Sequence, residues 1–241
     1  MNWILLYCLC IASLVTVLSC GYYFNVLAKK QITPYLEKEN SKGLLVKEFA
    51  YLMFNHYKLR NIDITTLHAK KTNFYSIKYN VIKLSPEVTH SKTLTDIALC
   101  TKCITQAKNQ QYHYLISTLN LIFSVISKFI TILLIPIILI CAILNISFEL
   151  SSFSYILTLI TLICYVSIFI IQLIIHFIKQ NSIKKTYNSL KKLETFNENE
   201  ITSIINILVA LNNQDFFLYT RYTLKFISLA SPTTFFDKKQ F

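Results

Sequence analysis

Several residue types are scarce in this 241-residue chain, and each scarcity excludes a class of structure or function. With 2 Gly and 4 Pro, the sequence has few turn-forming residues, which disfavours a turn-rich β architecture and favours long helices. Only Arg60 and Arg221 are arginines, so the planar, two-pronged recognition of phosphate has few donors. We therefore expect no nucleic-acid partner, although the formal net charge is +12.

The seven cysteines show no spacing typical of a disulfide framework. Five lie in apolar stretches, where a thiol behaves as a small hydrophobic group: Cys8, Cys10, Cys20, Cys141 and Cys164. The other two, Cys100 and Cys103, form a C-x-x-C motif. A redox pair of this kind normally opens a helix after a strand, whereas this one falls in the middle of a predicted helix. The two are weak candidates for a redox or metal site, and incidental helix cysteines are the alternative.

Three apolar stretches are long enough to cross a bilayer. Residues 1–24 carry no charged side chain, residues 114–146 carry only Lys128, and residues 153–178 carry none. About 20 apolar residues, rising 1.5 Å each, cross the hydrocarbon layer, so three transmembrane helices are predicted. A cleaved signal peptide, or a lipoprotein leader ending at Cys20, is the alternative for the first stretch, but no Lys or Arg precedes it.

Lysine is concentrated in the polar segments. Residues 25–112 hold 14 Lys and Arg against 6 Asp and Glu, lysines cluster again at 179–192, and the link 147–152 holds no basic residue. Because short loops rich in Lys stay in the cytoplasm, we expect a multi-pass protein of the cell membrane with cytosolic soluble parts. The lipid bilayer is then a partner, and the 179–192 cluster is either a topology anchor or a lipid-binding patch.

The polar segments show the periodicities of short secondary structures. Apolar residues at helical spacing predict helices over residues 43–59 and 92–111. Alternation of apolar and polar residues over 73–85 predicts a hairpin. The mixed aromatic stretch at 214–229 is expected to lie on a surface rather than to span.

The predicted fold class is therefore a mainly α membrane protein with three transmembrane helices and a small cytosolic α+β module. The expected segments are transmembrane helix 1 (1–24), the cytosolic module (25–113), transmembrane helix 2 (114–146), transmembrane helix 3 (153–178) and a cytosolic helical tail (179–241).

Two short motifs, together with the order of the segments, resemble those of a known family. The stretch Asn40-Ser41-Lys42-Gly43-Leu44 is similar to an N-S-R-G-L-like stretch of the bacterial, membrane-bound putative neutral zinc metallopeptidases. The stretch Leu84-Ser85-Pro86-Glu87-Val88 matches the L-S-P-x-V with which that family ends a hairpin. Two spans and a basic tail follow in the family, as they do here. The resemblance implies a zincin-like soluble module and a bacterial source.

The resemblance also implies where a zinc site would lie. In the family, the helix after L-S-P-x-V carries H-E-x-G-H, whose two His bind Zn²⁺ and whose Glu is the general base; a Glu after the last span is the third ligand. Carried over without gaps, the two His fall on Lys102 and Gln106, the base on Cys103 and the third ligand on Lys179. Ammonium groups repel a metal dication, so we expect no zinc cofactor and interpret the chain as a pseudoenzyme.

Two alternatives to a noncatalytic member with a membrane protein partner stay open. One is an active zinc-dependent membrane peptidase with non-standard ligands, for which His90, His113 and the C-x-x-C cysteines are conceivable donors. The other is an unrelated small membrane protein, such as an assembly subunit.

Overall fold

The computed structural model describes most of the chain and divides it into two compact units. The described residues are 3–66, 73–77, 79–112 and 151–230, with isolated positions between 113 and 150. Unit 1 comprises residues 1–25, 121–177 and 214–240, and unit 2 comprises residues 26–120, 178–213 and 241.

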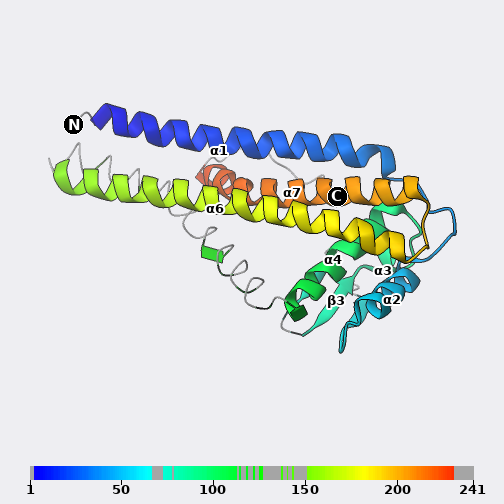
Figure 1. Ribbon diagram of the computed structural model, residues 1–241. Helices are drawn as coiled ribbons and strands as arrows, with labels where there is room; N and C mark the ends of the chain where they lie inside the picture. Colours follow the sequence, from blue (N-terminus) through cyan, green and yellow to red (C-terminus); the bar gives the residue numbers. More distant parts are fainter. Residues whose placement is uncertain are drawn as a thin grey trace. The chain divides into compact units, whose positions relative to one another are not determined.

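Three long helices contribute residues to both units: α1 (Trp3–Ile32), α6 (Ser151–Lys192) and α7 (Glu198–Ala230) (Figure 1). Within the described residues, two helical stretches are long and apolar enough to cross a membrane, Leu5–Tyr35 and Ser154–Lys192. The sequence predicts three such helices. The one predicted at 114–146, transmembrane helix 2, lies almost wholly outside the described residues.

The two predicted spans that the structure does describe belong to helices longer than expected. The charge-free stretch 1–24 continues as helix to Ile32, and the stretch 153–178 continues to Lys192. Lysine and other straight-chain residues have high helix propensity, so the loss of apolar character does not end a helix. The stretch 214–229 likewise lies within the continuous helix α7.

In unit 1, α1 and α6 pack side by side. Val17 and Tyr165, only 4% and 1% exposed, lie in one buried cluster. Further along both helices, the Phe24 and His176 rings have centroids 5.0 Å apart. Because higher residue numbers on α1 meet higher numbers on α6, the two helices run in the same direction.

The buried side of α6 in unit 1 carries small polar residues. Ser154, Thr158 and Thr161 are buried, whereas Ile156 and Ile160 are more than half exposed. The hydroxyl of Thr158 donates to the carbonyl of Ser154 at 2.8 Å, so it is satisfied within its own helix. Small residues at helix contacts with large apolar residues facing outward are typical of packing between membrane helices.

Unit 2 is built around a hydrophobic core to which residues from both of its long segments, 26–120 and 178–213, contribute. Phe49 on α2 (Val46–Tyr57) and Ile104 on α4 (Leu94–Tyr112) are fully buried in it. Leu190 on α6 and Ile204 on α7 are fully buried in the same core. The two helices predicted at 43–59 and 92–111 are therefore confirmed as α2 and α4, and the tail completes their core.

A three-stranded sheet lies in the same unit, in the order β1-β3-β2. Its strands are β1 (Asp63–Thr66), β2 (Phe74–Ser76) and β3 (Val81–Leu84). Strands β2 and β3 are antiparallel, with Tyr75 opposite Ile82, which confirms the predicted hairpin. The parallel pairing of β1 with β3, with Ile64 opposite Ile82, was not predicted.

The first family-like motif folds as a tight loop around the side chain of Asn40. Its Nδ2 donates to the carbonyls of Leu44 and Lys92 at 2.9 and 2.7 Å, and its Oδ1 accepts from the Leu44 N–H at 2.8 Å. Gly43 has a φ of 62°, in the left-handed region that favours glycine. The loop is thus fixed to the segment just before α4.

The second family-like motif starts a helix. The Ser85 side chain accepts from the Val88 N–H at 3.4 Å and so caps α3 (Pro86–Thr89), with proline at the first helical position. The Ser85 N–H donates to Asn73 Oδ1 at 2.7 Å. This motif therefore directs the chain from β3 towards α4.

Glu200 on α7 fastens the first motif to the tail. Its Oε1 accepts from the Ser41 N–H at 2.6 Å, and its Oε2 accepts from the Ser41 hydroxyl at 3.2 Å and the Asn197 N–H at 3.0 Å. Burial raises the pKa of Glu200, but these hydrogen bonds and the charge of Lys38 outweigh burial and leave the pKa below its ordinary value. The carboxylate is therefore stabilised in its charged form.

The variant Glu200→Gln is expected to destabilise the protein by about 1–3 kcal/mol, because charge-assisted hydrogen bonds are lost in a buried place. The thermal midpoint in detergent, followed by circular dichroism, should fall by roughly 2–8 °C. Because the folded-state pKa of Glu200 is lowered, its contribution is present above the ordinary glutamate pKa and is lost as pH falls through the lowered value. The difference between wild type and variant should therefore shrink in acid.

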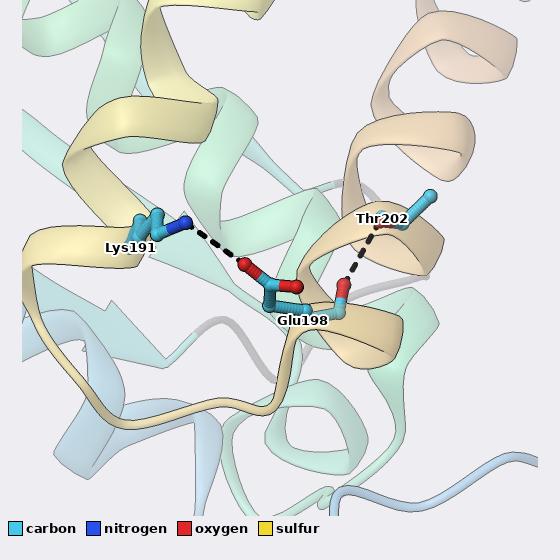
Figure 2. A network of polar contacts seen from close by, with 3 residues as sticks. All are labelled: Lys191, Glu198 and Thr202. Carbon is cyan, nitrogen blue, oxygen red and sulfur yellow. Dashed lines mark hydrogen bonds and ion pairs between the residues drawn. The ribbon is translucent and has the colours of Figure 1, made fainter.

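Glu198→Gln is the matched control on the same helical turn. Glu198 accepts from Lys191 at 2.8 Å, and its carbonyl accepts from Thr202 at 2.8 Å (Figure 2). The two charged side chains are 73% and 59% exposed, so solvent screens their attraction. The midpoint of this variant should stay near that of the wild type; an equal fall in both variants would contradict the anchoring role of Glu200.

Candidate functional site

Helix α4 carries three of the four positions that the resemblance assigns to the family's zinc site. Lys102 and Gln106 are four residues apart, which separates them by about 40° around a helix, so they share one side of α4. Gln106 is exposed and Lys102 is partly buried. Cys103, at the position of the general base, is only 3% exposed and belongs to the core of unit 2. The side chain at the base position is therefore turned away from water.

The fourth position lies on α6. Lys179 is exposed and belongs to the same unit as α4. Its neighbours along the helix, from Ile178 to Asn181, include no acidic residue that a shift in register could bring to its place. The position of the third ligand thus holds a cation that water reaches.

The C-x-x-C cysteines are part of the packed core. Cys100 and Cys103 are 0% and 3% exposed, and both are free thiols. Burial, with a smaller contribution from Cys103, raises the pKa of Cys100 well above its usual range. Redox exchange and metal binding both require the thiolate. The arrangement favours the interpretation of the two cysteines as core residues.

The residues at the positions predicted for the zinc site do not fit a zinc ion. Within the described part of the chain, no three His, Cys, Asp or Glu side chains lie close enough together to hold a metal. His90, one of the conceivable substitute donors, is exposed at the end of α3, and His113 lies outside the described residues. Two ammonium groups, an amide and a buried thiol stand where zinc needs imidazole and carboxylate ligands.

The comparison with known families decides the relationship. The family model described as "Putative neutral zinc metallopeptidase" matches residues 8–212, which is most of the 241 residues. The chain belongs to this family. The interpretation as an unrelated small membrane protein is therefore wrong, whereas the expectation drawn from the two motifs is confirmed. No curated protein and no solved structure matches the chain.

Membership of the zinc metallopeptidase family associates the fold with zinc. It does not show that the residues of this particular chain bind zinc. The match includes α4 and the part of α6 that holds Lys179. The substituted positions therefore fall inside the matched range rather than in an appended segment. The assignment of Lys102, Cys103, Gln106 and Lys179 to those positions stays a prediction.

A second group of residues on α4 and α6 was missed by sequence reasoning. Lys108 lies with its Nζ 4.0 Å from the centroid of the Tyr57 ring. Lys185 is near enough for its charge to act on Lys108. The three residues come from helices that are far apart in sequence, and only the fold brings them together. No local motif could have identified them.

The burial of the C-x-x-C motif predicts that neither thiol reacts in the folded protein. Maleimide should modify Cys100 and Cys103 only after denaturation, because burial removes both access and thiolate character. Peptide mass spectrometry before and after unfolding measures this.

A Gln106→Cys variant supplies the matched control, since it places a thiol on the exposed side of the same helix. That thiol should react in the folded protein at a rate close to that of a small free thiol. If Cys100 or Cys103 reacts as fast as the introduced cysteine, the motif is accessible, and this result would support a redox or metal-binding role for it.

Proposed function

We propose that this protein is a noncatalytic, membrane-embedded member of the neutral zinc metallopeptidase family that serves by binding a membrane protein partner. The observation that carries the proposal is the burial of Cys103, the residue at the position of the catalytic base, in the core of unit 2. A general base must reach the water that it activates. A thiol at 3% exposure cannot do so.

Electrostatics at the ligand positions supports the same conclusion. The ammonium groups of Lys102 and Lys179 offer no electron pair to a metal and repel its double positive charge. The amide oxygen of Gln106 is a weak ligand beside imidazole. Without a metal, nothing lowers the pKa of water towards neutrality, so hydroxide is scarce at neutral pH.

A binding role, rather than decay of the whole chain, is supported by the intact structural motifs. Asn40 makes three hydrogen bonds that fix its loop, and Ser85 caps α3. Glu200 ties the loop to α7. The residues that shape the fold are in place, whereas the residues required for chemistry are replaced. Such a molecule keeps a surface on which a partner can be recognised.

Three transmembrane helices are also part of the proposal. The core of unit 2 contains residues from both the 26–120 and the 178–213 segments, so both must lie on the same side of a membrane. If α6 crosses once, the chain between those segments must cross once more in the opposite direction. The apolar stretch 114–146 is the segment long enough to do so.

The direction of α1 and α6 agrees with this topology. Two parallel spans in one chain require an intervening crossing, and α1 and α6 run in the same direction in unit 1. The excess of lysine in the segments of unit 2 supports a cytosolic position for that unit. The protein is then a multi-pass protein of the cell membrane with its amino terminus outside.

Membrane topology can be measured with one cysteine introduced on each proposed side of the membrane and an impermeant maleimide. Lys47→Cys on α2 should be labelled only after the membrane is opened, because unit 2 is cytosolic. Ser147→Cys, in the link that holds no basic residue, should be labelled in intact cells. Labelling of both, or of neither, in intact cells would contradict the three-span arrangement.

The loss of catalysis predicts that the purified wild-type protein holds no stoichiometric zinc. Elemental analysis after incubation with zinc and gel filtration measures the content, and hydrolysis of an unfolded substrate, with and without phenanthroline, measures activity. Both should be at background. Stoichiometric zinc with phenanthroline-sensitive hydrolysis would instead support an active peptidase with non-standard ligands.

The assigned positions predict that zinc binding can be restored. Lys102→His, Gln106→His and Lys179→Glu, introduced together, should bind about one zinc ion per chain, since two imidazoles and a carboxylate form a sufficient set of ligands.

The matched control combines Lys179→Glu with a histidine pair of the same spacing at Thr95 and Leu99. It should bind no zinc, because those positions lie about 10 Å along α4 from the assigned pair. Zinc binding by the control and not by the first variant would show that the assigned register is wrong.

A further inference from the structure

Three helices of unit 2 meet at the side chain of Tyr57. This residue ends α2 and is 7% exposed. Its ring carries the ammonium group of Lys108, from α4, at 4.0 Å from the centroid. Its hydroxyl has Ser189 and Thr186, both on α6, as hydrogen-bond partners. A cation and several hydroxyl groups are thus held together on a rigid part of the fold.

A second cation is near enough for its charge to act on the first. Burial, and next the positive charge of Lys185 on α6, lower the pKa of Lys108. Among the described residues, the contacts found for Lys108 and Lys185 include no carboxylate. Two like charges brought together from different helices repel each other, and an anion between them would remove that cost.

The sequence positions of the two lysines indicate where such an anion would come from. Lys108 lies six residues before the apolar stretch 114–146, and Lys185 lies seven residues after the stretch 153–178. Seven residues of helix span about 10 Å. The phosphate groups of a bilayer lie in a layer that begins where the hydrocarbon ends and is roughly 5–8 Å thick on each side.

We propose that Lys108 and Lys185, together with the hydroxyl groups around Tyr57, form a binding site for one phosphate group, that of an anionic phospholipid. The source of the phosphate rests on the proposed membrane topology, whereas the phosphate site itself does not. The site is also independent of the zinc positions, since Lys102 and Gln106 lie on another side of α4. Lysine suits this ligand because its ammonium group acts as a point charge with three donors.

The test measures how fast Lys108 is acylated in the full-length protein. The protein is placed in nanodiscs of phosphatidylcholine alone or with phosphatidylglycerol, and a small amine-reactive ester is applied. Mass spectrometry of the peptide that contains Lys108 gives the rate. The anionic lipid should slow the reaction about tenfold, since a charge-assisted contact to phosphate corresponds to roughly that factor.

Two charge-matched variants show whether the effect belongs to a site. Lys185→Gln should abolish the difference between the two kinds of nanodisc, because half of the cationic pair is gone. Lys184→Gln removes the same charge one residue away on the exposed surface of α6 and should keep the difference. Circular dichroism checks that both variants fold. The ratio of the acylation rates in the two kinds of nanodisc, taken within each variant, cancels any change in the intrinsic reactivity of Lys108.

Each other outcome overturns part of the proposal. Equal rates in both nanodiscs would show that the site has no preference for an anionic lipid, which overturns the proposal. If Lys184→Gln and Lys185→Gln lose the rate difference between the two kinds of nanodisc to the same extent, the attraction is a diffuse one to a charged surface and not that of a site. Protection by soluble glycerol phosphate in phosphatidylcholine nanodiscs would keep the phosphate site but overturn its lipid source. Failure of the cysteine-labelling test of topology would remove the lipid source independently.

Discussion

The core of unit 2 is the constraint on which most of the molecule depends. It closes only when the segment that carries α2 and α4 meets the end of α6 and the first half of α7. Leu190 and Ile204 are as fully buried in it as Phe49 and Ile104. Burial of this kind contributes about 25 cal/mol for each Å² of apolar surface removed from water. The core therefore determines the burial of the C-x-x-C motif and the positions of Lys108 and Lys185, and it underlies the proposed number of membrane crossings.

The same core explains how a member of a hydrolytic family can lose its chemistry and keep its fold. The hydrogen bonds of Asn40, Ser85 and Glu200 hold loops and helix ends, and they require no metal. Three of the positions predicted to matter for catalysis lie on α4, a helix that is already held by packing against its neighbours. Replacing ligands on its exposed side costs little stability, and a thiol at Cys103 suits a buried place better than a carboxylate.

Much of the fold follows from the sequence, and the exceptions have physical reasons. Periodicity predicts α2, α4 and the hairpin because each has a buried and an exposed side. Strand β1 is not predicted, because it is four residues long, mostly exposed and paired in parallel, so that apolar and polar residues alternate only weakly along it. The ends of α1 and α6 are not predicted, because lysines continue a helix after the apolar stretch has ended. Of the candidate site, the positions on α4 follow from the motif, whereas the meeting of Tyr57, Lys108 and Lys185 depends on tertiary packing.

The order in which the core receives its parts bears on how the protein is made. Translation delivers α2, the sheet and α4 well before α6 and α7, yet Leu190, Ile201 and Ile204 are needed to cover them. Until those residues leave the ribosome, the apolar sides of α2 and α4 stay open to water. A nascent chain in this state is prone to aggregation and is a substrate for chaperones. Synthesis of the tail, rather than of the module itself, is the step that completes folding.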